Sequence, residues 1–312
     1  MKKVIISLVL LLACITAIYV WNAPRYTKAD TIYLNANDAV SYARLQKLAH
    51  ALNKEGYRTI VSTQNNFKSG LFNIYAANNN QQAALPPVVD SKAINLLWVP
   101  AVVENQPEPL RAYDVIVVEN MSSFLHLKAV NVRTAYIPEA IDIISVSNKK
   151  PQNKIMYYGD ATAFSLALYL VGTTNLTVDL FGKGFEKNNN QNKFVKEAPK
   201  ASDFTDYSLI LIDQSDEEIA QELINQRIIT AIENGGLPYI RYNNGVAKIF
   251  GNKLPMYANE QEFLPKAQMF LNNPVLIAEN KEALRQIAHN WNTQSQAKKF
   301  TEILEIMKKK MK

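Results

Sequence analysis

Residues 206–242 read DYSLILIDQSDEEIAQELINQRIITAIENGGLPYIRY, and this stretch decides the fold class. The apolar run Leu209–Ile212 predicts a buried strand. Ser215 and Glu218 follow with the spacing of a capping box, in which a hydroxyl accepts from a first-turn amide and a carboxylate reaches back. Helical spacing of isoleucines comes next, and then a second apolar run. The stretch therefore predicts one β-α-β unit of an α/β protein.

An arginine lies inside the apolar helix of this unit. Gly235 and Gly236 end the helix, because glycine readily adopts the left-handed conformation at a helix C-terminus. Arg227 lies among isoleucines, and a guanidinium in such surroundings needs an anionic partner. That partner is either a ligand or a carboxylate of the chain, for which Asp213 and Asp216 are the candidates.

The composition is that of an ordinary globular body. The chain of 312 residues is long enough for two domains with real cores, and its net charge of +6 is modest. No basic run is interleaved with aromatic residues, so a nucleic-acid partner is not expected. The single cysteine excludes an internal disulfide, and the dispersed histidines His50, His126 and His289 give no metal motif. Neither a metal nor a cofactor is expected.

Residues 1–28 carry a candidate membrane anchor. Val4–Trp21 contains no formal charge and approaches the length of a spanning helix, so an uncleaved anchor is expected. A cleaved leader and a lipidated Cys14 are the alternatives. The lysines before the segment favour a cytoplasmic N-terminus, whereas Arg25 and Lys28 after it oppose that orientation.

Strand-type and helix-type segments alternate through the rest of the chain, which is typical of a parallel, doubly wound sheet. The polar stretch 147–153 interrupts the alternation. We therefore expect a Rossmann-like domain at residues 29–147 and a second at 148–312. The polar segments 65–89 and 187–200 are expected to be loops, the first with one short element at most.

The later part of the chain resembles the C-terminal domain of group 1 glycosyltransferases of the GT-B fold. Within them it is most similar to the spore-maturation-protein-like subgroup. The segments that carry the resemblance are IMYYG (155–159), VDLFGKGF (178–185), LID (211–213), NQRIITA (225–231), GGLP (235–238) and residues 259–274. Residues 114–118 and 136–142 resemble the strand and the inter-domain entry before that domain. The resemblance implies that the last helix, 293–310, packs back towards the N-terminal domain.

The family binds a nucleotide-sugar in the cleft between its two domains, and this implies a donor site here. The residues assigned to it are Gly159, Asp160, Lys183, Arg227, Thr230, Glu233, Gly235 and Gly236. By the resemblance, Arg227 lies near the donor phosphates, where a fixed guanidinium stabilises the departing diphosphate. Thr230 stands where the family usually has a glutamate, and Glu233 follows one turn later.

Two side chains of the N-terminal half are candidate catalytic residues. His126 is a candidate general base, and Glu119, which follows a strand and could face the cleft, is the other candidate. The ordinary interpretations are a helix cap near Glu119 and a solvated histidine. Likewise, the ordinary interpretation of Gly235 and Gly236 is that they end a helix, and that of Lys183 is that it lies in a turn.

The resemblance implies a glycosyltransferase that moves a sugar from a nucleotide donor to a glycan or lipid-linked acceptor of the cell envelope. The alternative is a non-catalytic GT-B-like protein that binds a glycan or a partner in the envelope. Thr230 favours this alternative, because it departs from the family pattern at a donor-binding position.

Overall fold

The computed structural model describes residues 30–63, 66–77, 93–102, 109–144, 151–161, 165–185 and 193–311. The candidate anchor Val4–Trp21 and the expected domain boundary at 148 lie outside these residues. Among the helices that are described, none is both long enough and apolar enough to cross a membrane.

Two six-stranded sheets form the body, and every pair of neighbouring strands is parallel. The first sheet has the order β2-β1-β3-β4-β5-β6. Its strands are β1 (Thr31–Ala36), β2 (Arg58–Thr63), β3 (Phe72–Ala76), β4 (Ile94–Val99), β5 (Val115–Val118) and β6 (Thr134–Tyr136). The central strands β3, β4 and β5 are buried at every residue, as expected for parallel strands covered on both faces.

The second sheet has the order β12-β11-β10-β7-β8-β9. Its strands are β7 (Gln152–Tyr158), β8 (Val178–Phe181), β9 (Lys193–Lys196), β10 (Tyr207–Ile212), β11 (Pro238–Arg241) and β12 (Met256–Tyr257). In both sheets the strand order reverses once, between β1 and β3 in the first and between β7 and β10 in the second. Ligands of open α/β sheets bind beyond the carboxyl ends of the strands at such a point.

Helices connect the strands of both sheets in the described residues. The α-helices are α2 (Ala39–Lys54), α3 (Met121–Ala129), α4 (Leu166–Gly172), α5 (Ala201–Asp206), α6 (Asp216–Ala220), α7 (Gln226–Glu233), α8 (Asn244–Phe250), α9 (Glu260–Leu271), α10 (Pro274–Asn290) and α11 (Thr293–Met311), with 3-10 turns at Pro109–Ala112 and Gly251–Lys253. Both halves of the capping box at Ser215 are formed, so this prediction is confirmed. Asn225 caps the separate helix α7, and Gly235 after it has φ 75.

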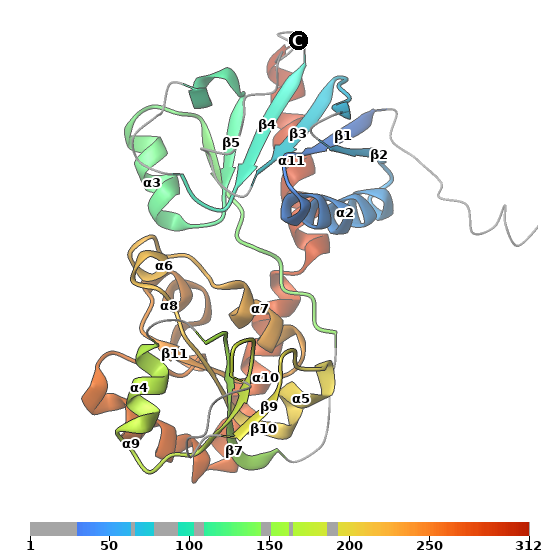
Figure 1. Ribbon diagram of the computed structural model, residues 1–312. Helices are drawn as coiled ribbons and strands as arrows, with labels where there is room; N and C mark the ends of the chain where they lie inside the picture. Colours follow the sequence, from blue (N-terminus) through green and yellow to red (C-terminus); the bar gives the residue numbers. More distant parts are fainter. Residues whose placement is uncertain are drawn as a thin grey trace, which may run out of the picture.

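The last helix belongs to the core of the first sheet. Ala297, Phe300 and Leu304 of α11 are buried with the residues of β1, β3 and β4, and α11 packs against α2. The Phe300 ring meets the Trp98 ring edge-on, with centroids 5.0 Å apart. The expectation that the last helix returns to the N-terminal domain is therefore confirmed. Figure 1 shows the chain passing between the two sheets twice, once after β6 and once between α10 and α11.

Candidate functional site

The carboxyl ends of β7 and β10 meet at the point where the order of the second sheet reverses. Asp160 lies after β7, and Gln214 lies after β10. The side-chain amide of Gln214 is buried, and neither its nitrogen nor its oxygen has a hydrogen-bond partner among the described residues. Unpaired amide groups are costly inside a protein, which marks this edge as a candidate ligand site.

Arg227, the second residue of α7, joins this edge. Its Nη2 donates a hydrogen bond of 2.6 Å to Oδ2 of Asp160, and the two side chains remain 35% and 47% exposed. The guanidinium carbon lies 5.8 Å from the centroid of the Tyr158 ring. The predicted intramolecular partners Asp213 and Asp216 are wrong, because Asp160 holds Arg227 and Asp216 pairs with Arg241 instead.

The turns after β7 and β8 are bound to one another. Oδ1 of Asp160 accepts the backbone amide of Lys183 at 2.9 Å, and the amide of Ala161 donates to the carbonyl of Lys183 at 2.8 Å. Gly182 has φ 151, and a Cβ there would lie 1.6 Å from the carbonyl oxygen of Gly159. The structure thus brings together four of the predicted donor residues, which are Gly159, Asp160, Lys183 and Arg227.

The other predicted donor residues lie further along α7. Thr230 is half-buried one turn after Arg227, and its carbonyl accepts the side-chain amide of Asn234 at 2.7 Å. Gly235 and Gly236 follow the opposite end of the helix. A Cβ on Gly236 would meet Ile210 of the core at 3.0 Å, so close packing accounts for this glycine. The structure places neither glycine beside Arg227.

Glu233 holds the segment that connects the two sheets. The backbone amide of Asp142 donates a hydrogen bond of 3.2 Å to Oε1 of Glu233. The backbone amide of Ile144 donates a hydrogen bond of 2.8 Å to the backbone carbonyl of Glu233. Lys47 belongs to α2 of the first domain, and its Nζ lies 3.9 Å from the same carboxylate oxygen. We call the connecting segment 141–144, with the residues that bind it, the hinge. Burial raises the pKa of Glu233, although Lys47 opposes the shift. Its contacts are those of a hinge residue.

Glu119 is part of a buried ion pair in the first domain. It follows β5 and pairs with Arg44 of α2, and the two side chains are 9% and 13% exposed. The Arg44 guanidinium carbon lies 4.1 Å from the centroid of the Trp98 ring. Burial lowers the pKa of Arg44, which the charge of Glu139 opposes. Arg44 therefore occupies the Glu119 carboxylate.

His126 lies on α3. Asn120 caps the first turn of this helix, because its side-chain oxygen accepts a hydrogen bond of 2.6 Å from the backbone amide of Ser123. The helix rise places His126 about 9 Å along the axis from this cap, away from the carboxyl edge of β5. The interpretation of this strand end as a helix cap is therefore confirmed for Asn120.

Sequence reasoning missed Glu139. This residue follows β6 on the segment between the sheets, and its carboxylate has no hydrogen bond or ion pair within the described residues. Burial raises its pKa, with the charge of Glu233 acting in the same direction and those of Arg44 and Lys47 against it. Glu139 lies in the segment 136–142 that resembles the inter-domain entry, but the resemblance assigns it no role, and only the fold reveals that it lies near Arg44.

Comparison with known proteins establishes the architecture. No protein-family model and no curated protein matches the chain. An S. aureus TarM variant in complex with fondaparinux, alpha-GlcNAc-glycerol and UDP is similar with a TM-score of 0.57 and 13% identity, over 82% of this chain and 58% of that one. A Thermobaculum terrenum O-GlcNAc transferase variant has a TM-score of 0.51 and 10% identity, over 92% and 68%. An alpha1,3-fucosyltransferase with GDP-fucose has a TM-score of 0.50 and 10% identity, over 89% and 91%.

These likenesses show the fold, which is GT-B. The chain spans only 58% of the TarM chain. The narrower resemblance to the spore-maturation-protein-like subgroup is not confirmed.

Proposed function

We propose that the protein transfers a glycosyl group from a nucleoside diphosphate donor to a hydroxyl of a glycan or lipid acceptor. The observation that carries this proposal is Arg227 beside the joined turns of Gly159–Ala161 and Gly182–Gly184, at the reversal point of the second sheet. The neighbours with UDP and with GDP-fucose support the donor class. We assign the donor to the second domain and the acceptor to the first, with the domain boundary near residue 148.

The chemistry requires a positive charge at the leaving group. As the anomeric carbon–oxygen bond breaks, both electrons of the bond move onto the diphosphate, and a guanidinium stabilises that charge. Asp160 holds Arg227 in place before the donor arrives. The exposure of both side chains leaves the guanidinium accessible to a phosphate on its open side.

The acceptor hydroxyl must lose its proton as it attacks the anomeric carbon. Of the carboxylates described above, we propose Glu139 as the base, because it lies on the segment between the two sheets, has no ion-pair partner among the described residues, and has a pKa raised by burial. The proton moves to Glu139, the new carbon–oxygen bond forms, and the nucleoside diphosphate leaves. Glu119 and His126 remain the candidates from sequence, and Arg44 occupies the Glu119 carboxylate.

We further propose that the acceptor belongs to the cell envelope and that residues 4–21 anchor the chain in a membrane. The uncharged composition of Val4–Trp21 supports this part of the proposal. Mass spectrometry of the mature chain tests it. An N-terminus after Ala23, or a diacylated Cys14, would contradict the uncleaved anchor.

Calorimetry with UDP, GDP and the corresponding nucleosides tests the transferase proposal. We expect the chain to bind one of the diphosphates and to bind its nucleoside much more weakly. If the folded chain binds no nucleotide at millimolar concentration, the transferase proposal fails. The non-catalytic glycan- or partner-binding protein then takes its place.

A further inference from the structure

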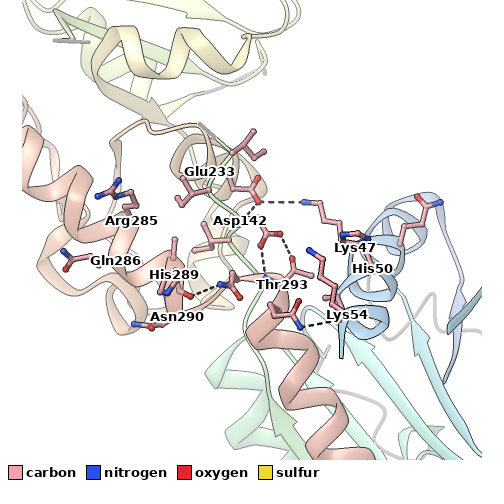
Figure 2. A pocket seen from close by; sticks show the side chains of 18 of the residues that line it. Lys47, His50, Lys54, Asp142, Glu233, Arg285, Gln286, His289, Asn290 and Thr293 are labelled. Carbon is pink, nitrogen blue, oxygen red and sulfur yellow. Dashed lines mark hydrogen bonds and ion pairs between the residues drawn. The ribbon is translucent and has the colours of Figure 1, made fainter. Parts of the chain in front are cut away.

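A cavity lies between the second half of α2 and the last turns of α10, beside the connecting segment 141–144. Its volume is about 1190 Å³, ample for a phosphorylated metabolite. The walls come from both domains and both connecting segments: the second half of α2, residues 141–144, the end of α7, the last turns of α10 and the start of α11 (Figure 2). Glu233, at the end of α7 opposite Arg227, is the only predicted donor residue that lines it.

The acidic side chains of this hinge pocket already have partners. Asp142 accepts the backbone amide of Thr293 at 2.9 Å and also its hydroxyl. Glu233 accepts the Asp142 amide, and Glu282 pairs with Arg285 at 2.5 Å. The carboxylates of Asp142 and Glu233 therefore join the hinge segments to one another, whereas the Glu282 pair lies within α10.

Two of the basic side chains of the pocket, Lys47 and Arg285, are paired with Glu233 and Glu282. Lys47, His50 and Lys54 occupy one face of α2 at intervals of three and four residues. Arg285 and His289, four residues apart, share a face of α10. Lys47 is 61% exposed, with Nζ 3.9 Å from Glu233. Figure 2 shows Lys47 and Lys54 extending from α2 towards the hinge segment.

The side chains of His50, Lys54 and His289 have no hydrogen-bond or ion-pair partner in the part of the chain that the structure describes. Unpaired basic side chains thus lie on both walls of the pocket, His50 and Lys54 on the α2 wall and His289 on the α10 wall. Such an arrangement suits an anion with a charged group at each end.

We propose that the hinge pocket binds a small anion with two phosphate groups, and that the bound anion fixes the orientation of the two domains. The α2 wall moves with the first sheet and the α10 wall with the second, because each helix packs in the core of its own domain. An anion that contacts both walls therefore has a higher affinity for one relative orientation of the domains. This site is independent of the donor site around Arg227.

Titration of the full chain with inorganic pyrophosphate tests the proposal. We compare wild type with the double variant Lys54→Gln/Arg285→Gln, with Arg227→Ala, and with Lys298→Gln/Lys309→Gln as a charge-matched control on α11. Calorimetry should show a hinge-pocket site that binds pyrophosphate at least tenfold more weakly in the first double variant and unchanged in the Lys298→Gln/Lys309→Gln control. Arg227→Ala should leave this site as in wild type and weaken only a second pyrophosphate bound in the donor site. All substituted side chains are at least partly exposed, so circular dichroism should show each variant folded.

Hydrogen exchange supplies a second measurement. The amides of Ile141, Asp142 and Ile144 are bonded across the hinge, and their exchange should slow when pyrophosphate binds to wild type. It should not slow in Lys54→Gln/Arg285→Gln. The proposal is overturned if wild type binds no pyrophosphate at millimolar concentration. Loss of all pyrophosphate binding in Arg227→Ala alone, or equal loss in the control, would also overturn it, since the anion would then lie in the donor site or act through net charge.

Discussion

The Arg227 guanidinium pairs with one carboxylate of the fold and lies near the Tyr158 ring, and its side chain is partly exposed. Arg227→Ala should therefore leave the fold intact, because the side chain is 35% exposed and its loss opens no core cavity. The substitution should weaken the binding of nucleoside diphosphates by about 1.5–3 kcal/mol, the range for a hydrogen bond to a charged group. Nucleosides should bind unchanged. Calorimetry on wild type and variant measures both effects.

Arg58→Ala is the matched control for this prediction, since it removes the same charge from an exposed position on the edge strand β2. Its diphosphate affinity should equal that of wild type. An Arg227→Ala chain that unfolds, together with a wild type that binds no nucleotide, would show that Arg227 has a structural role.

Glu139→Gln tests the proposed base. The amide keeps the size of the side chain but cannot take a proton, so kcat should fall by about 10²–10⁴-fold while donor affinity stays constant. In wild type, kcat/KM should rise as pH increases through the raised pKa of Glu139, because the base acts when deprotonated. A pH series of donor turnover measures this limb. If kcat/KM of Glu139→Gln rises with pH as in wild type, the titrating group is another residue.

The sequence does not predict that Asp160 is the partner of Arg227. Asp160 was assigned to the donor site because it follows a strand, but its bond to an arginine 67 positions away depends on two strands lying side by side. Spacing along the chain favoured the nearer Asp213 and Asp216. Gln214 and Glu139 escaped notice for the same reason, because burial distinguishes them and local pattern does not.

At the scale of elements, the turns after β7 and β8 depend on a close backbone approach. Gly182→Ala would place a Cβ 1.6 Å from the Gly159 carbonyl oxygen, at a φ of 151 that side chains rarely adopt. We expect it to destabilise the protein by more than about 1 kcal/mol. Gly172, at the end of α4, has no atom within 4 Å of such a Cβ. Gly172→Ala should raise stability by about 0.4–1 kcal/mol, and urea unfolding of both variants decides between the effects.

Elements with local signals were predictable, and those that rely on pairing were not. The capping box at Ser215 and the glycine after α7 can be predicted from the sequence, because each satisfies backbone groups of nearby residues. The expected loop 187–200 instead contains β9, whose sequence KFVK is half charged. β9 pairs with β8 at the edge of the sheet, where charged side chains reach solvent. Within the described part of 65–89, β3 agrees with the expectation of one short element.

At the scale of the whole molecule, α11 completes a domain that begins far earlier in the sequence. Phe300→Ala should cost about 3–5 kcal/mol, because it removes a fully buried ring from contact with Trp98. Ile306→Ala on the same helix should change stability by about 0.5 kcal/mol or less, since Ile306 is 53% exposed. Urea unfolding compares the two variants. Equal effects would mean that α11 does not contribute to the core of the first sheet.

The path of the chain also sets an order of events during synthesis. Residues 151–290 supply the whole second sheet and the helices around it, so this domain can close as soon as they leave the ribosome. The first sheet emerges earlier but waits for Phe300 and its neighbours to cover one face. At about 5–20 residues per second, translation from β6 to α11 takes on the order of ten seconds. For that interval a nascent apolar surface is open to chaperones, and the half of the protein made first is the half that folds last.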